Sequence, residues 1–452
     1  MRRSSRVLLC VLLWVGCLLG VGTAHGAVFT VGPGGGHATV QAALNAAMAA
    51  PGNDEIRVHT GTYAENLSVV LPAGSVDEID LHGGWNDGFS QAVGNPAATV
   101  INGGGLDSTL IVNAGGGALR VRGLTLRGGN GRSAGGGGVR ARVDAGRLTI
   151  LNCQLLNNLA HAGGGGFIQV SESGDFRLSD SVVKGNRADS ATNAAGGGLY
   201  LSGEGNSLLT VERTRILQNR IRSNVAQRTG GGFYASLAGN AQVALEDVEV
   251  SNNRLEGTAV GVGSGGALWL FGNAKANVRR SRLLGNQDIN TNNTGVEALS
   301  LISDQASQLT ASDSLVAQGA VGRGTGVAAF AGTTGRLRMN NLTVVDSGRS
   351  GVVARELESG VVTIFNTLVF GHTTNLDAPA NVQVGNNLIG VDPKFVDRAQ
   401  RNYRLKTGSP AGNKGRNNPP GGLGKADLDG SARIKGARVD IGAYESVPGS
   451  AS

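Results

Sequence analysis

Arginine follows the asparagine that ends three successive segments of the chain, in Asn186-Arg187-Ala188, Asn219-Arg220-Ile221 and Asn253-Arg254-Leu255. The planar guanidinium group can bind both oxygens of a carboxylate, so this residue type suits an acidic ligand. If the segments stack on one another, Arg187, Arg220 and Arg254 form one column, named here the arginine column. Like charges in a column repel unless they are splayed apart, screened by salt or bound to an anion. An acidic polysaccharide would supply carboxylates along the column, whereas three splayed and solvated arginines would need no ligand.

Aromatic side chains form a second candidate column, on strands that follow runs of glycine. The strands read Leu199-Tyr200-Leu201, Phe233-Tyr234-Ala235 and Leu268-Trp269-Leu270, and alternation along a strand turns the middle residue outward. Aromatic residues make up only 4% of the chain, so this is a concentration. Sugar rings can pack their apolar faces on such a strip. We predict a carbohydrate-binding groove whose floor is this aromatic column, Tyr200, Tyr234 and Trp269, and whose wall is the arginine column.

Two long loops, residues 187–195 and 220–229, join the arginine column to the aromatic column. They offer an alternative to a groove, because loops of this length can fold over the aromatic side chains and bury them as a satellite core. The exposure of the three aromatic side chains therefore discriminates between a binding surface and a packed layer.

A third column carries charges of alternating sign, six residues before the end of each segment. Its members are Asp180, Arg213, Asp247, Arg280 and Asp313. One interpretation is an arginine–aspartate site for catalysis or for a sugar carboxylate. The other is a stack of exposed ion pairs between neighbouring segments, in which every charge is satisfied internally. The strict alternation favours the stack.

Metal and cofactor motifs are sparse. Asp427-Leu428-Asp429-Gly430 looks like the start of a calcium loop, but the remaining ligands of a 12-residue loop do not follow. Cysteine and histidine show no metal-ligand spacing, and neither a phosphate-binding loop nor a nucleophile elbow occurs. We expect no cofactor, with Ca²⁺ as the one ion to consider.

A repeat positions these columns. Asn158, Asn186, Asn219, Asn253 and Asn286 end five units and are spaced 28, 33, 34 and 33 residues apart. Each unit has a glycine run, a short apolar strand, a loop, a second strand and a turn. Weaker copies end near Gly129, Gly319, Ser347 and His372. A constant period of this length is typical of stacked supersecondary units.

Positions within a unit indicate strands joined by corners. The residues eight and three before the final Asn are large and apolar, and the residue five before it is mostly small. These three positions face inward. The residues seven and six before the final Asn must then both face outward, and two consecutive outward residues break the alternation at a corner between two strands. Strands and corners at a constant period form a parallel coil, with equivalent residues about 4.8 Å apart. The Asn residues then form a stacked amide ladder in a turn.

Composition excludes several classes of protein. Glycine supplies 75 of 452 residues, hydrophobic residues make up 40%, charged residues 16%, and proline only 10 positions. A disordered chain would be poorer in apolar residues and richer in charge. The glycine therefore belongs to a folded chain with a sizeable core.

The first 26 residues have the pattern of a secretory signal peptide. Arg2, Arg3 and Arg6 precede a nearly unbroken apolar run over 7–21, and Ala24-His25-Gly26 offers a cleavage site before Ala27. The run is short for a membrane span; a membrane anchor and a lipoprotein at Cys17 are the alternatives. Removal lowers the formal net charge from +7 to +4 and leaves Cys153 as the one cysteine. We expect export to the periplasm, the cell envelope or the medium, and no nucleic-acid partner.

The chain resembles the right-handed parallel β-helix proteins of the pectin lyase-like group. GHATVQAALNAA (36–47) followed by IRVHTGTYAENLSV (56–69) matches their N-terminal entry. Val40, Leu44 and Met48 put an apolar stripe on a short helix. The resemblance implies an all-β, single-stranded right-handed parallel β-helix, a solenoid, with a short N-terminal α-helical cap over the open end of the core.

The tail resembles the choice-of-anchor Q segment of secreted bacterial β-helix proteins, on VDPKFVD (391–397), YRLKTGSPAGNKG (403–415) and DLDGSARIKGARVDIGAYE (427–445). Family members often have Asp where this chain has Asn413. We therefore divide the chain into a signal peptide (1–26), an N-terminal cap with the first rungs (27–115), β-helix repeats (116–375) and a C-terminal closing segment (376–452).

The resemblance implies fold and export but no single activity, since one fold carries many functions. The first hypothesis is an exported, monomeric protein that interacts with a polysaccharide, possibly acidic, without established catalysis. The second is a polysaccharide lyase or glycoside hydrolase, which would need a carboxylate, Lys or His converging on the groove. The third is an adhesin or structural surface protein, whose columns need no ligand.

Overall fold

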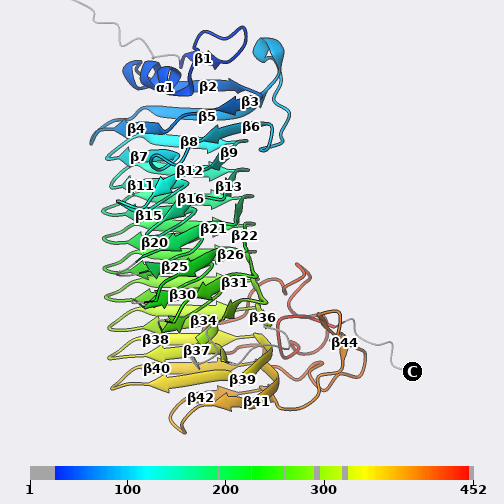
Figure 1. Ribbon diagram of the computed structural model, residues 1–452. Coiled ribbons are helices and arrows are strands. Elements are labelled where there is room, and N and C mark those ends of the chain that lie inside the picture. The colour runs from blue at the N-terminus through cyan, green and yellow to red at the C-terminus, as the bar shows by residue number, and fades with distance from the viewer. Residues whose placement is uncertain are drawn as a thin grey trace, which may run out of the picture.

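The protein is a parallel β-solenoid (Figure 1). Its computed structural model describes residues 26–190, 194–224, 227–258, 260–289, 296–317 and 324–446. Residues 1–25 of the predicted signal peptide lie outside the described residues. The coil forms two long sheets, A and B, because each strand pairs in parallel with the equivalent strand one rung away.

Sheet A contains 13 strands, in the order β1 (Val28–Val31), β2 (Asn53–His59), β5 (Glu78–Trp85), β8 (Ala118–Arg122), β12 (Arg147–Leu151), β16 (Asp175–Ser179), β21 (Leu208–Glu212), β26 (Gln242–Glu246), β31 (Lys275–Arg279), β35 (Gln308–Ser312), β38 (Arg336–Asn340), β40 (Val361–Phe365) and β42 (Gln383–Gly385).

Sheet B joins 21 strands, which are β3 (Gly61–Tyr63), β4 (Leu67–Leu71), β6 (Thr99–Asn102), β7 (Leu110–Ala114), β9 (Thr125–Arg127), β11 (Val139–Val143), β13 (Gln154–Leu156), β15 (Gly166–Val170), β17 (Val182–Lys184), β20 (Leu199–Gly203), β22 (Arg215–Leu217), β25 (Phe233–Leu237), β27 (Glu249–Ser251), β30 (Gly266–Leu270), β32 (Arg282–Leu284), β34 (Val296–Ser303), β36 (Leu315–Ala317), β37 (Thr325–Ala331), β39 (Thr343–Glu356), β41 (Leu368–Asp377) and β43 (Leu388–Ile389).

Three smaller sheets complete the fold. Sheet C is formed where the loops begin, directly after the asparagines that end the units; this side of the coil is named here the loop side. Its strands are β10 (Asn130–Gly131), β14 (Leu159–Ala160), β18 (Arg187–Asp189), β23 (Arg220–Arg222), β28 (Arg254–Glu256) and β33 (Gln287–Asp288). Sheet D consists of β19 (Ala194–Ala195), β24 (Arg228–Thr229) and β29 (Gly261–Val262). The antiparallel pair is β44 (Phe395–Asp397) with β45 (Asn402–Leu405). A 3₁₀ turn spans η1 (Asp87–Phe89).

The predicted corner is present between sheets A and B. The residue six before the final Asn adopts a positive φ in every unit of the charged column: 52° at Asp180, 44° at Arg213, 56° at Asp247, 46° at Arg280 and 51° at Asp313. Left-handed backbone at one position turns the chain from one strand into the next, and Asp and Asn tolerate it better than most residues. The small residue that follows is buried, as predicted, for example Cys153 and Ser181.

The asparagine ladder is continuous over five rungs. Asn219 illustrates its bonds: its Oδ1 accepts from Asn186 N and from Asn186 Nδ2, both at 3.0 Å. Its Nδ2 donates to Asn253 Oδ1 at 3.0 Å and to the carbonyl of Val183 at 3.0 Å. The side chains of the ladder are at most 2% exposed. Each rung is therefore tied to the next by buried amides that are fully used.

His372 extends the ladder with an imidazole in place of an amide. Its Nδ1 lies 3.2 Å from Ser347 N, and its Nε2 lies 3.1 Å from the carbonyl oxygen of Val344. A backbone N–H can only donate and a carbonyl can only accept, so the proton resides on Nε2. His372 thus reproduces two of the four bonds that Asn219 makes, the one from a backbone N–H and the one to a carbonyl of the preceding rung. Ser347 and His372 are the weak repeat ends identified in the sequence.

Glycine runs mark a close approach between backbones. A Cβ added at Gly164 would lie 2.7 Å from the backbone nitrogen of Arg187, and one at Gly197 would lie 2.9 Å from the carbonyl oxygen of Arg220. The strands of sheet C pass directly over the glycine runs that precede β15 and β20. Residues with side chains at these positions would push sheet C away from the coil.

One helix, α1 (Val40–Ala49), lies at the N-terminal end of the coil (Figure 1). It contributes Val40, Leu44 and Ala47 to the main apolar core, all fully buried. The Glu65 carboxylate accepts from Val40 N and Gln41 N at 2.9 Å each, where helix amides lack internal partners. In the described part of the chain, no helix is both long enough and apolar enough to span a membrane.

The C-terminal segment, residues 390–446, lies against the side of the last rungs (Figure 1). A second apolar core joins the two parts; from the coil it includes Leu315, Val345 and Leu368, and from the segment Tyr403 and Ile441. Hydrogen bonds reinforce the contact, since the corner residues of the last rungs bind the segment's backbone, as Asn366 does with Arg416.

Replacing Asn219 by Ala should interrupt the ladder. Asn186 would lose the acceptor for its backbone N–H and for its side-chain amide, two buried donors that cost about 1–3 kcal/mol each when unsatisfied. We expect Asn219→Ala to lower the free energy of unfolding in urea by roughly 3 kcal/mol. The neighbouring exposed substitution Arg220→Ala serves as control and should change it by less than about 0.5 kcal/mol. Equal effects of the two would refute a stabilising ladder.

Stability should decrease below about pH 6.5 because of His372. Burial lowers the pKa of His372, and only its neutral form can accept from Ser347 N. The stabilisation is present above the pKa of the unfolded chain and is lost as the pH falls through the lower folded pKa. Asp346 and Arg398 act on the same ring with opposite sign.

His372→Asn keeps both ladder bonds without a titrating ring, so it isolates this contribution. The difference in free energy of unfolding between the wild type and His372→Asn should change between pH 7 and pH 5. A constant difference would show that folding does not change the pKa of His372.

Candidate functional site

The arginine column exists as predicted. Arg187, Arg220 and Arg254 are in register on β18, β23 and β28 of sheet C, and Gln287 follows on the next rung. The spacing is that of paired strands, about 4.8 Å. The asparagine ladder sets this register, because each arginine directly follows a ladder residue.

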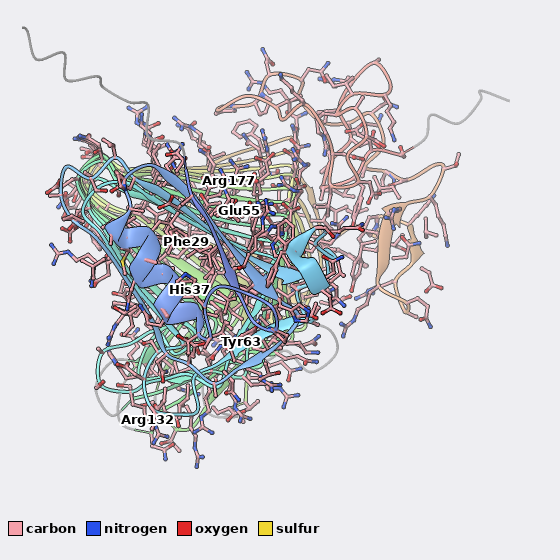
Figure 2. All side chains as sticks on the ribbon, turned by 90° about the horizontal axis from the view of Figure 1, so that it is seen from above. Phe29, His37, Glu55, Tyr63, Arg132 and Arg177 are labelled. Atoms are coloured by element: carbon pink, nitrogen blue, oxygen red, sulfur yellow. The ribbon has the colours of Figure 1, made fainter. Side chains whose placement is uncertain are left out.

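The three arginines differ in their ion pairs. Arg187 is half-buried and its Nη2 lies 2.8 Å from the Asp189 carboxylate, which also lies 3.4 Å from Arg132. Arg220 and Arg254 are exposed and make no ion pair with any residue that the structure describes. Figure 2 places Arg132 on the opposite side of the coil from Glu55 and Arg177 of sheet A. Two guanidinium groups on the loop side are thus open to an external anion.

The aromatic column differs from the prediction at Trp269. Tyr200 is in register with Tyr234, but Tyr234 pairs with Ala267, and Trp269 pairs with Ser236. Trp269 therefore lies two residues further along its strand. The cause is Gly266, which occupies the position opposite Phe233, where a Cβ would lie 2.2 Å from the phenyl ring. Counting from the glycine run gave the wrong register, because this run is interrupted by a serine.

The aromatic rings nevertheless form one continuous stack. Phe167 lies face to face with Tyr200, with centroids 4.5 Å apart and an interplanar angle of 18°. Tyr200 and Tyr234 are 5.2 Å apart, and Tyr234 meets Trp269 edge to face at 5.4 Å. Phe167 was missed in the sequence, because it follows its glycine run directly, whereas Tyr200 and Tyr234 are each separated from theirs by one residue.

Burial limits what this stack can bind. Tyr234 is only 9% exposed, and burial raises its pKa to about 12. Tyr200 and Trp269 are half-buried, and burial also raises the pKa of Tyr200. The rings contact one another along the column, so a sugar could reach only the parts of Tyr200 and Trp269 that remain exposed.

The loops form a satellite core of their own, which consists of Ala188, Ala194, Ile221 and Leu255 under sheets C and D. A buried ion pair also connects two loops of this side. The guanidinium of Arg228, 0% exposed, donates to both carboxylate oxygens of Asp288 at 3.2 and 3.3 Å. The described residues of the loop side therefore form a packed layer, and this layer supports the arginine column.

The column of alternating charges pairs internally. Arg213 binds both oxygens of Asp180 at 2.7 and 2.8 Å, and Arg280 binds both oxygens of Asp247 at 2.9 and 2.7 Å. The arginine lowers the pKa of the Asp180 carboxyl. These bonds support the structural interpretation over a ligand site.

Asp313, the fifth member of the column, departs from this pattern. It is 1% exposed, and its partner is Arg433 of the C-terminal segment at 3.4 Å. Arg433 also lies 2.8 Å from Glu445, whose pKa burial raises to about 7, and it donates to the carbonyl of Gly442 at 2.9 Å. The last carboxylate of the repeat is thus used to hold the segment.

The suspected calcium motif also has protein partners. Asp427 accepts from the backbone nitrogens of Asp429, Ser431 and Glu445 at 2.8–3.0 Å. The Asp429 carboxylate binds Arg404 at 2.6 and 2.7 Å. Within the described residues, no cluster of three or more His, Cys, Asp or Glu side chains could hold a metal ion.

Sheet A carries a charged cluster that sequence analysis missed. Glu55 on β2 and Asp80 on β5 are opposite each other on neighbouring rungs, and Arg122 lies 3.5 Å and 2.8 Å from them. Arg57 lies 2.8 Å from Glu55 and 4.3 Å above the ring of Trp85. The strand alternation at 53–59 and 78–85 would have placed these residues on one face, but nothing in the sequence links the two segments.

A cleft of about 320 Å³ lies between β26, β31 and β35 of sheet A and the C-terminal segment. Glu246, Asn277, Arg279 and Thr310 form its floor, and residues 421–424 form one wall. Arg279 lies 2.6 Å from Glu246, so the charges of the floor are paired.

Comparison with known proteins gives little beyond this geometry. No family model matches the chain, and no curated protein matches its sequence. Among solved structures, the crystal structure of the pectate lyase Pel9A is similar with a TM-score of 0.45 and 14% identity, over 94% of this chain and 97% of that chain.

Replacing Arg433 by Met should loosen the C-terminal segment. The substitution keeps most of the side-chain volume but leaves Asp313 and Glu445 buried without a cation, which costs about 3–5 kcal/mol for a buried pair. Limited proteolysis should then cleave within 390–446 much faster than in the wild type. The control is Arg438→Met, at an exposed position of the same segment. Equal cleavage rates for the two variants would show that Arg433 does not hold the segment.

Proposed function

We propose that this is an exported protein that binds an acidic polysaccharide along its loop side, without catalysis of its own. The observation that carries the proposal is the exposed pair Arg220 and Arg254, in register on neighbouring rungs and free of ion pairs within the described residues. A repeating uronate chain presents carboxylates that a regular column of guanidinium groups can bind one after another.

The six site residues have different roles in this proposal. Arg220 and Arg254 bind carboxylates directly, and Arg187 extends the column but shares its charge with Asp189. Tyr200 and Trp269 offer their exposed parts to sugar rings. Tyr234 lies between them and positions both, since its own surface is almost fully buried.

Export and surface location are part of the same proposal. Residues 1–26 act as a signal peptide, α1 caps the open core end, and 376–452 act as a choice-of-anchor Q-type closing segment. Asn413, where related segments often have Asp, has a φ of 54° and accepts from Arg438 N at 3.3 Å. Its local role is therefore in the turn. We propose a monomer, with no resident metal.

An enzyme acting on acidic polysaccharide is the second candidate, and the charged cluster of sheet A favours it. Glu55 and Asp80 place two carboxylates on neighbouring rungs, and burial lowers the pKa of the adjacent His82, which keeps its ring neutral near pH 7. An absorbance assay for unsaturated uronate products over pectate, alginate and glycosaminoglycans tests the lyase reaction. A reducing-sugar assay on the same substrates tests hydrolysis.

The double substitution Arg220→Ala/Arg254→Ala should weaken binding to acidic glycans. Two exposed charge pairs contribute together about 1–1.5 kcal/mol, which corresponds to roughly a tenfold loss of affinity. A glycan array identifies the ligand, and titration at 50 and 300 mM NaCl measures the affinity, which should fall with salt.

Arg142→Ala is the matched control, because Arg142 is exposed but paired with Asp144 at 3.0 Å on β11. Equal affinities for the double variant and the control would place the binding site elsewhere. A silent glycan array together with binding to host cells would favour an adhesin instead.

A further inference from the structure

The Asp54 carboxylate is buried beside the backbone nitrogen of Ala27. Ala27 N donates to Asp54 Oδ1 at 2.7 Å, and Asp54 is only 3% exposed. Its second oxygen, Oδ2, is buried and accepts no hydrogen bond in the part of the chain that the structure describes. A carboxylate in such a place normally needs a cation or several donors. A single amide N–H leaves it under-satisfied.

Strand alternation accounts for this burial. On β2, Ile56 and Val58 point into the main core, so Asp54, two residues earlier, points the same way. Its partner on β5 is Ile79, which is also buried. The carboxylate therefore lies at the apolar N-terminal end of the coil, where an unpaired charge is costly.

The backbone around Ala27 is also held in place by its pairing with β2. The carbonyl of Ala27 accepts from Glu55 N at 2.9 Å, and β1 begins with Val28 in register with Glu55. The nitrogen of residue 27 therefore stays next to Asp54 whatever precedes it. Space before it is tight, since a Cβ at Gly26 would lie 1.4 Å from the carbonyl oxygen of Asn53.

The cleavage site predicted from the sequence falls at this nitrogen. Hydrolysis of the Gly26–Ala27 bond consumes one water and leaves a carboxylate on Gly26 and an amine on Ala27. That amine is protonated near neutral pH, and it then carries three N–H donors and a positive charge. This is the partner that the second oxygen of Asp54 lacks.

We infer that Asp54 is a binding site for the α-ammonium group of Ala27, which forms when the signal peptide is removed. The ion pair locks β1 onto β2 at the N-terminal end of the coil. The mature chain is consequently more stable than any form that retains residues before Ala27. This inference rests on the proposed export but not on the proposed ligand.

Two forms of the protein test the site directly. One begins at Ala27 with a free amine, and the other retains a Ser-Gly extension that ends in Gly26; each is made with Asp54 and with Asp54→Asn. The free-amine form should have an unfolding equilibrium constant about ten- to a hundredfold smaller than the extended form, as for one charged hydrogen bond. Asp54→Asn should abolish this difference.

Two controls separate the site from a local effect. Asp77→Asn removes a carboxylate that accepts from Gly52 N at the same end of the coil, and it should weaken both forms equally. Acetylation of the Ala27 amine in the wild type should reproduce the extended form, which keeps the test valid if Asp54→Asn does not fold.

Equal stability of the two forms, with an equal effect of Asp54→Asn on both, would overturn the inference and leave Asp54 as a cap for an ordinary amide. The intact mass of the protein secreted by its host reports the cut separately. A mass that begins at a residue other than Ala27 would overturn the inference through the export proposal. The stability comparison would then show whether the ammonium site exists in the recombinant chain.

Discussion

The buried amide ladder is the constraint on which the remaining columns depend. In a parallel sheet with one apolar face, a register slip of one residue would turn the apolar side chains outward. A slip of two residues would keep them on the inward face, so the apolar pattern alone does not prevent it. Asn219 excludes such a slip, because its side chain bonds the rungs on both sides at one fixed height. Arg220 follows it directly, so the ladder also determines where the guanidinium groups stack. The regular stacking of the arginine column therefore depends on the buried asparagine ladder.

Glycine has a second structural role, which is to bring the loop side close to the coil. Gly164 and Gly197 allow the strands of sheet C to cross at backbone contact distance, and without this approach the loop side would lack its support. Gly266 serves a different purpose, since it leaves room for the ring of Phe233 on the neighbouring rung. Glycines in similar sequence contexts are thus required by different neighbouring groups, either a backbone or an aromatic ring.

That difference explains which parts of the structure could be predicted. Positions counted from the ladder asparagines were right, including the corner at Asp180 and the stack of Arg187 on Arg220. Positions counted from the glycine runs failed at Trp269, because the number of glycines follows the volume of residues one rung away. The buried partner of Asp313 could not be predicted at all, since it lies 120 residues away in a segment outside the repeat.

Toward each end of the solenoid a buried carboxylate requires a positively charged or N–H partner from outside the repeat. Inside the repeat, the charges of the corner column are satisfied by a residue on the neighbouring rung, as in the pairing of Arg213 with Asp180. Near the ends the neighbouring rung lacks the matching charge, as at Asn341, the corner residue after Asp313, and a buried carboxylate then needs a partner from elsewhere in the chain. Asp313 receives Arg433, and the arrangement around Asp54 has the same form, with a backbone nitrogen in place of a guanidinium. The ends of a repeat are therefore where its buried charges should be sought, and where processing of the chain can alter stability.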